Sequence, residues 1–441
     1  MLLVYTHKVT PRLTYTFKHF FTRILQIRVQ FTMKVEEFIA HNGLKFTYSK
    51  QPLRNEFYVR SNGLLFEQGI NDIEITMGTW EDTVCFFQSR QAATIPFDIF
   101  AATFYLLSRY EEYLPHVKDN FDRFPAEESL AYKNNFLEKP LIDIWAYKFR
   151  ELLKEKFPSY QFENRKFTYV STIDVDMAFC FKHKGIVRNI GGYFSDLLKF
   201  KLVEIWNRTL VLLGFRLDPF DTFEELISLQ KQYGITTTFF FLVGDYTTYD
   251  KNISSSNSKL KSLIKSIADY ADVGLHPSYF TMKNEALLKK EKLRLENILN
   301  RPVLKSRQHY LRLDMPETYQ NLINLEVQED YTMGYAAYYG FRASTCTPFY
   351  FYDLDYEIQT PLKIYPFAVM DGTLRDYLEL SNKRAYEVII RLAREVKKVE
   401  GTFITLFHND TVSNTGRWRR WKKVYIDVFK KLTAFQTSNV S

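Results

Sequence analysis

The sequence predicts an α/β protein with a parallel sheet, and two observations carry that prediction. From about Lys166 to the C-terminus, short runs of β-branched and aromatic residues alternate with segments of helical periodicity. Several of these runs end in acidic residues or histidines, at the carboxyl ends of strands where parallel sheets place function. The alternation fits either a (β/α) barrel or a doubly wound open sheet.

The chain before about residue 160 has a less regular pattern. Two segments, 97–113 and 141–157, show helical patterning. Short β-like runs precede or separate them, at residues 2–5, 27–32, 56–60 and 83–87. Because 441 residues exceed the ~100–200 of a typical single domain, we expect an α/β accessory domain over residues 1–160 and a second domain over 161–441.

The second part has a regular order of expected elements. Strand-like runs occupy residues 167–176, 236–243, 273–276 and 402–408, with shorter ones toward Arg307 and near Tyr331. Helical patterns lie between them at residues 222–233, 260–267, 287–300, 319–323 and 388–392, and a last helix covers 418–432. We expect residues 180–218 and 345–360 to be loops that shape the pocket.

Composition and charge exclude several classes of protein. Hydrophobic residues make up 46% and charged residues 25%, as in soluble globular proteins, and no apolar run reaches the ~18 residues of a membrane span. The three cysteines are widely spaced, which argues against disulfide or cysteine-zinc frameworks. The N-terminus MLLVYTHKVTPRL has no signal-peptide core, so we expect a cytoplasmic protein.

The net charge of +8 does not by itself indicate an anionic partner. The final segment, RWRRWKKVYIDVFKK, is basic and aromatic, a composition seen at nucleic-acid and membrane-surface contacts. Its apolar residues form one helical stripe, however, which favours a buried face with solvated lysines and arginines. We expect no nucleic-acid partner, and peripheral contact with a membrane stays open.

Two acids end the first strand of the second part. Asp174 and Asp176 stand two positions apart, so a strand directs both carboxylates to the same face. Close carboxylates repel unless a cation balances them, and such pairs are typical of acid–base or metal sites. A solvated turn at the strand end is the structural alternative, which the apolar run before the acids disfavours.

Histidines follow two other strands. His276 stands in the run GLHPS and His408 in the run LFHND, each where a strand-like segment gives way to polar residues, so two of the eight histidines stand at equivalent strand exits. A lone histidine is more often a hydrogen-bonded structural residue than a ligand, but this shared placement favours a functional role. Arg307, in RQHYLR, also follows an apolar run.

With these residues in place, the segment from about Lys166 to Phe435 resembles the NodB-type polysaccharide deacetylases, in the subgroup whose acid motif reads DVD. The resemblance implies a distorted (β/α) barrel of deacetylase type with an additional N-terminal α/β domain, and a hydrolase that removes acetyl groups from N-acetylated carbohydrates. It also implies roles for five residues: Asp174 as general base, Asp176 and His276 as metal ligands, His408 as general acid and Arg307 as the arginine that orients the base.

The sequence departs from that family at one position. A second histidine is expected four residues after His276, where this chain has Phe280. A catalytic zinc usually has three protein ligands, so the third must come from elsewhere, and His309 in RQHYLR is the candidate. The resemblance thus predicts a divalent metal cofactor, Zn²⁺, with Asp176 and His276 as ligands, and we take His309 as the candidate third ligand. The alternatives are a weak site, a site for another metal, or an inactive site.

Three functions are compatible with these residues. The first is a metal-assisted hydrolase of an acetyl–nitrogen bond in a carbohydrate or polysaccharide precursor. The second is a catalytically impaired deacetylase-like protein that binds a glycan through its many aromatic side chains. The third is a glycosidase that uses Asp174 with another acid across the barrel mouth. This option is weaker because the two acids, Asp174 and Asp176, stand close together on one strand.

Overall fold

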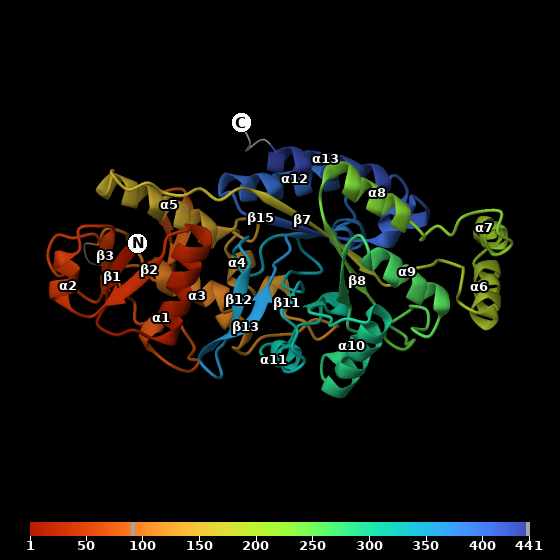
Figure 1. Cartoon of the computed structure of the whole chain (residues 1–441), viewed down its shortest axis with the longest axis horizontal. Helices are drawn as coiled ribbons and strands as arrows, with labels where there is room; N and C mark the ends of the chain where they lie inside the picture. The colour runs from red at the N-terminus through yellow and green to blue at the C-terminus, as the bar shows by residue number, and fades with distance from the viewer. Residues whose placement is uncertain (90–92, 438–441) are drawn as a thin grey trace.

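The computed structural model describes residues 1–89 and 93–437. The molecule is elongated: the N-terminal sheet lies at one end, a large mixed sheet lies in the middle, and the helices α6 and α7 form the other end (Figure 1). This arrangement confirms the α/β class.

The N-terminal part contains a four-stranded parallel sheet in the order β2-β1-β3-β4. Rings of Phe46, Phe100 and Phe149, with centroids 5.5–5.7 Å apart, form the centre of the core between this sheet and its helices. The elements are β1 (Leu2–Tyr5), α1 (Pro11–Phe17), β2 (Val29–Thr32), α2 (Val35–Ala40), β3 (Lys45–Ser49), β4 (Tyr58–Arg60), the antiparallel pair β5 (Met77–Trp80) and β6 (Thr83–Phe86), α3 (Ile99–Leu107), α4 (Leu130–Lys133) and α5 (Leu141–Lys156).

The second part is built on a nine-stranded sheet in the order β12-β13-β11-β10-β9-β8-β7-β15-β14. All neighbours pair in parallel except β12 with β13. The strands are β7 (Thr168–Val175), β8 (Thr237–Phe241), β9 (Asp272–Leu275), β10 (Lys305–Ser306), β11 (Glu329–Asp330), β12 (Phe349–Asp353), β13 (Ile358–Ile364), β14 (Val369–Met370) and β15 (Thr402–His408).

Helices pack around this sheet. In Figure 1, α8, α12 and α13 lie at the top, and α9, α10 and α11 lie toward the bottom and right. The helices are α6 (Ile186–Leu198), α7 (Leu202–Leu212), α8 (Phe223–Tyr233), α9 (Ser258–Ala268), α10 (Glu285–Leu299), α11 (Glu317–Asn324), α12 (Asn382–Lys398) and α13 (Trp421–Thr437). Burial on both faces explains why strands such as β8, with five buried residues, read as unbroken apolar runs.

The segment 358–370 runs from one end of the row of parallel strands to the other. Its first part is β13, which pairs with β11, and its last part is β14, which pairs with β15. Between them, Phe367 donates a backbone hydrogen bond to Met333, and Ala368 donates one to Ile404. The strand order is open, from β12 to β14, so the closed barrel stays a prediction, and this segment is the part of the chain that would close it.

Most expected elements are present with changed bounds. The helix expected over 97–113 ends at Leu107, because Arg109 adopts a left-handed backbone conformation (φ 55°). The stripe expected in the last helix is buried, as predicted: Trp421, Val424 and Leu432 all face the core. The prediction that residues 180–218 and 345–360 form loops was wrong, since α6 and α7 lie in the first segment, and β12 and the start of β13 lie in the second.

A buried ion cluster joins the N-terminal part to the second part. The Glu112 carboxylate pairs with Arg342 at 2.6 Å and with Arg109 at 2.7 Å, and all three side chains are buried. Burial opposes ionisation of Glu112, but the two guanidinium groups lower its pKa to about 2. The boundary near residue 160 remains a prediction, because the two parts share one continuous core.

We expect Glu112→Gln to lower the free energy of unfolding at pH 7 by about 3 kcal/mol, since it leaves two buried guanidinium groups without their carboxylate. The folded-state pKa lies below the usual value, so this contribution is present above pH ~4.5 and is lost as the pH falls toward 2. Denaturant unfolding of the wild type and the variant should therefore show a difference that narrows below pH 5.

The matched control is Glu387→Gln, which removes an exposed pair with Arg384 and should change stability by less than about 0.5 kcal/mol. A difference between wild type and Glu112→Gln that is the same at pH 7 and pH 4 would contradict the assignment.

Candidate functional site

Four strands deliver polar side chains to one edge of the large sheet. Asp174 lies in β7 with Asp176 just beyond it, and His408 ends β15 opposite Asp174 in register. His276 follows β9, and Arg307 follows β10. Since parallel strands end at the same edge, this register gathers residues that are up to 234 positions apart in the sequence.

Asp174 and Arg307 form a buried ion pair. The Arg307 Nη1 atom lies 2.8 Å from Asp174 Oδ1, and neither side chain is more than 3% exposed. Arg307 Nε donates to the Tyr331 carbonyl oxygen at 3.0 Å, and its guanidinium lies over the Phe240 ring at 4.7 Å. These contacts fix the orientation of the Asp174 carboxylate.

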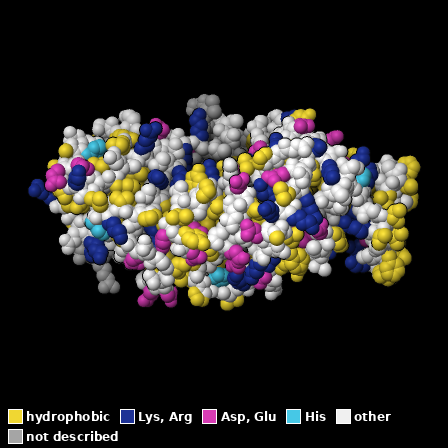
Figure 2. Space-filling model, turned by 60° about the horizontal axis from the view of Figure 1, so that its bottom comes forward, with side chains coloured by type: hydrophobic (Ala, Val, Ile, Leu, Met, Phe, Trp, Pro, Cys, Tyr) yellow, Lys and Arg dark blue, Asp and Glu magenta, His cyan; other side chains and the backbone are white. Residues whose placement is uncertain are grey.

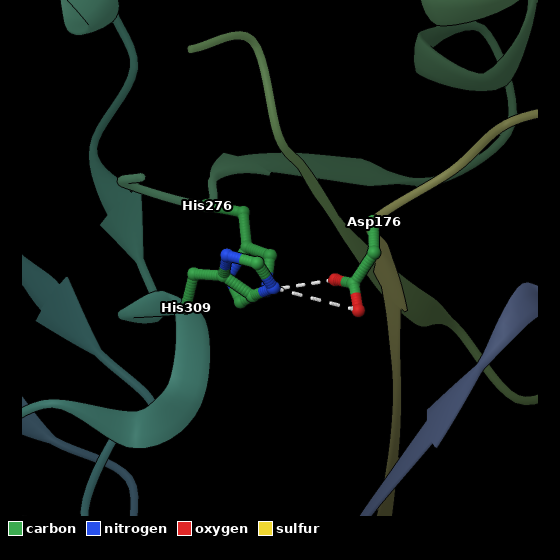
Figure 3. A group of neighbouring side chains, drawn as sticks. All are labelled: Asp176, His276 and His309. Carbon is green, nitrogen blue, oxygen red and sulfur yellow. Dashed lines mark ion pairs between the residues drawn. The ribbon is translucent and has the colours of Figure 1, made fainter. Parts of the chain in front are cut away.

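Asp176 stands opposite three imidazoles, two of which are drawn in Figure 3. Its Oδ1 lies 3.2 Å from His276 Nε2, and its Oδ2 lies 3.6 Å from His309 Nε2 and 3.7 Å from His408 Nε2. The side chain of Asp176 is 34% exposed, whereas His276 and His309 are buried. A carboxylate and three ring nitrogens thus converge at one point beneath the surface.

The second nitrogen of each imidazole has a fixed partner. His276 Nδ1 is hydrogen-bonded to the Arg307 carbonyl oxygen, His309 Nδ1 to Asp250 Oδ1 at 2.8 Å, and His408 Nδ1 to Asp371 Oδ1 at 2.8 Å. A carbonyl or carboxylate oxygen can only accept, so each Nδ1 carries the proton. In the neutral rings the Nε2 lone pairs then all point toward Asp176, the arrangement of metal-binding histidines with outer partners.

The donor set of Asp176, His276 and His309 fits a divalent metal ion. Their ligand atoms lie within 4.8 Å of one another, and two imidazoles with one carboxylate are a common set for catalytic zinc. Asp176 Oδ1 is buried and accepts no hydrogen bond among the described residues, despite the nearby Nε2 of His276. A cation placed between Asp176 Oδ1 and His276 Nε2 would bind a lone pair of each atom.

The charges of the site are strongly coupled. Burial opposes ionisation of Asp176, but the neighbouring imidazoles, His309 first, hold its pKa well below the usual range. Burial alone would lower the pKa of His309, yet the carboxylates of Asp176 and Asp250 raise it to about 9. Despite burial, Asp371 and Asp176 raise the pKa of His408 well above its ordinary value. Against the effect of burial, the neighbouring imidazoles thus hold the pKa values of the Asp176, Asp250 and Asp371 carboxyls below their usual values.

A cavity of about 540 Å³ opens over these residues. Its walls include aromatic side chains, Tyr310, Tyr377 and Trp418, and an arginine from the N-terminal part, Arg123. Tyr310 and the following Leu311 both have left-handed backbone conformations (φ 59° and 55°), a strained turn of the kind found at binding sites. The volume and walls suit a small organic ligand.

All six residues predicted from the sequence border this cavity or support it: Asp174, Asp176, His276, Arg307, His309 and His408. Their individual roles stay predictions. Phe280, at the position where the resembled family has a histidine, is 49% exposed and contacts the rings of Tyr249 and Tyr279.

Three residues of the site were not predicted. Asp371 follows the two-residue strand β14, which is too short to give a periodic signal, although an acid after an apolar run was visible in the sequence. Asp250 lies in an irregular segment between β8 and α9, and Arg123 comes from the N-terminal part. No local pattern in the sequence indicates that Asp250 or Arg123 belongs to the site.

Comparisons with known proteins give partial likenesses. A family model described as a family of unknown function (DUF7033) matches residues 2–158. No curated protein matches the chain. In the part of the chain that the structure describes, no helix is long and apolar enough to cross a membrane.

Solved structures similar to this chain include a proposed polysaccharide deacetylase from Mycobacterium smegmatis, with 13% identity, 62% of this chain and 85% of that chain covered, and a TM-score of 0.40. A CE4 domain of a xylanase from the hindgut metagenome of Trinervitermes trinervoides has 11% identity, 62% and 85% coverage and a TM-score of 0.32. A CE4 family pseudoenzyme from Bacillus anthracis has 12% identity, 62% coverage of both chains and a TM-score of 0.30. Because these likenesses are weak, we take the chemistry of the site from its own geometry.

We expect Asp250→Ala to weaken zinc binding about 10–100-fold, because His309 loses the carboxylate that holds its ring and its tautomer. Competition with a chromophoric chelator measures the affinity. Asp245→Ala is the control, since Asp245 is exposed and pairs only with Lys290 and Arg294 among the described residues. Equal zinc affinity in the wild type and Asp250→Ala would remove His309 from the ligand set.

Proposed function

We propose that the site hydrolyses the acetyl–nitrogen bond of an N-acetylated carbohydrate, with Zn²⁺ held by Asp176, His276 and His309. The observation that carries the proposal is the convergence of these three ligand atoms with a second carboxylate, Asp174, and a third imidazole, His408, in one cavity. The DVD spelling at the end of β7 supports placing the second part with the NodB-type deacetylases, in a distorted barrel.

Asp174 is the proposed general base. One of its oxygens is held by Arg307, and the other lies 3.7 Å from His276 Nε2, beside the proposed metal ligands. Arg307 holds the carboxylate in place, and the oxygen that Arg307 leaves free can take a proton from an attacking water. Arg307 itself is a positioning residue, since its guanidinium is fully buried behind Asp174.

His408 is the proposed general acid. Asp371 holds its Nδ1 at 2.8 Å, and its Nε2 faces the cavity near Asp176. A proton on Nε2 can pass to the nitrogen of the departing amine, which is a poor leaving group without it. When bound, a divalent ion would supply Lewis-acid polarisation of the acetyl carbonyl.

A sugar is the proposed substrate because the cavity combines polar groups with aromatic walls. Tyr310, Tyr377 and Trp418 can pack against the apolar faces of a sugar ring, while the acids and imidazoles reach its N-acetyl group. We extend the proposal to a cytoplasmic carbohydrate precursor, a location supported by the free thiols of Cys85, Cys180 and Cys346.

A second candidate is a deacetylase-like protein that binds a glycan without turnover. The observation that favours it is Phe280, whose exposed ring joins Tyr249 and Tyr279 close to the site instead of providing a metal ligand. Such a protein would bind N-acetyl sugars in the same cavity and release no acetate.

We expect the zinc-loaded wild type to release acetate from N-acetylglucosamine oligomers, and Asp174→Asn to lower kcat by about 10³-fold or more, since the base is lost. Acetate release measured by a coupled assay gives the rates. Zinc content should be unchanged in Asp174→Asn, because Asp174 is outside the proposed ligand set.

The matched control is Asp245→Asn, an exposed acid that should keep wild-type kcat. Sugar binding by the zinc-loaded wild type without acetate release would favour the second candidate. Full activity in Asp174→Asn would reject the assignment of the base.

A further inference from the structure

Helices α6 and α7 expose a large apolar surface at one end of the molecule. We call it the α6–α7 face, and define it by six side chains that are each 61–88% exposed: Ile190, Phe194, Leu198, Phe200, Val203 and Trp206. Hydrophobic atoms cover the same end of the molecule in Figure 2. Contiguous apolar patches of this kind mark interaction sites.

The polarity of the helix pair is inverted. Polar groups lie between the two helices: Arg208 pairs with Asp196 at 2.7 Å, and the hydroxyls of Tyr193 and Thr209 are hydrogen-bonded at 2.9 Å. No residue of α6 is buried. In a helix pair that is exposed to water, the apolar sides usually face each other and the polar sides face the solvent. Here the polar groups lie between the helices and the apolar side chains face outward.

Hydrogen bonds connect the base of the helix pair to the rest of the fold. The buried carboxylate of Asp218 accepts hydrogen bonds from the backbone N–H groups of residues 180–182 at 2.6–2.9 Å, which ties the two ends of the segment together. Arg188 donates to the carbonyl oxygens of Asn252 at 2.8 Å and Lys251 at 2.7 Å. These bonds fix the base of the segment that carries the α6–α7 face.

Basic side chains lie next to exposed apolar residues in the connection between the two helices and after α7. Lys199 and Lys201, both exposed, flank Phe200 in the connection between the helices. Exposed Arg216 stands between Phe215 and Leu217, which are 76% and 82% exposed. Cations beside inserted aromatic and aliphatic side chains complement anionic lipid headgroups.

We propose that the α6–α7 face inserts into the interfacial layer of an anionic lipid bilayer. With 13 and 11 residues, α6 and α7 are about 20 Å and 17 Å long, too short to cross a hydrocarbon core of ~30 Å. They would lie in the plane of the interface with their apolar sides toward the acyl chains.

A second copy of the chain is the competing occupant. A symmetric dimer would place the same patch of both subunits face to face. Lys199, Lys201 and Arg216 of both subunits would then lie in or around one interface, and this excess of like charge opposes the contact. Charge complementarity therefore favours the lipid surface, and the inference does not depend on the proposed function.

Co-sedimentation of the full chain with vesicles tests the inference. We expect binding to phosphatidylcholine vesicles that contain phosphatidylglycerol and at least about tenfold weaker binding to pure phosphatidylcholine, since the anionic headgroups attract the lysines and arginine. Phe200→Asp/Trp206→Asp should weaken binding to the anionic vesicles at least about tenfold, because it puts charges into the apolar layer. Lys199→Glu/Lys201→Glu, on the exposed connection, should remove the preference for anionic vesicles.

The matched control is Ile39→Asp/Val117→Asp, which changes two side chains that are 63% and 71% exposed outside the α6–α7 face and should bind as the wild type does. Wild-type protein that stays in the supernatant, or equal losses in the control and the Phe200/Trp206 variant, would overturn the inference. So would light scattering that shows a wild-type dimer and a Phe200→Asp/Trp206→Asp monomer, because a second copy would then cover the face.

Discussion

Arg307 connects the proposed base with one proposed metal ligand, and the arrangement of the site depends on it. Its guanidinium holds Asp174, while its own carbonyl oxygen accepts the hydrogen bond from His276 Nδ1. One residue at the end of β10 thus orients a carboxylate on β7 and an imidazole after β9. Because the guanidinium is buried against Phe240, its position is set by the core of the sheet, and the site inherits the rigidity of the strands.

The site residues that could be predicted from the sequence are those that stand at the ends of strands. Asp174, Asp176, His276 and His408 could be found because apolar runs end at them and parallel strands end together. Asp250 could not, since it reaches His309 from an irregular segment whose conformation depends on tertiary contacts. The α6–α7 segment was taken for a loop because its apolar residues have no core to face, although their spacing is helical.

The N-terminal part does more than cover one end of the sheet. It supplies Arg123 to the cavity, where Nη1 of Arg123 donates to the Tyr310 carbonyl oxygen at 2.8 Å. It is also tied to the second part through Glu112 and Arg342, and through Asp143, which accepts a hydrogen bond from Thr345 at 2.6 Å. These buried contacts give the N-terminal part a structural means to shape the wall of the cavity.

X-ray absorption at the zinc edge of the loaded protein tests the central claim most directly. The account predicts one zinc per chain with two imidazole nitrogens and carboxylate oxygen at about 2.0–2.2 Å, and loss of this environment in Asp176→Ala. A zinc environment that is the same in Asp176→Ala as in the wild type, or one without imidazole, would contradict the claim that Asp176, His276 and His309 hold the metal.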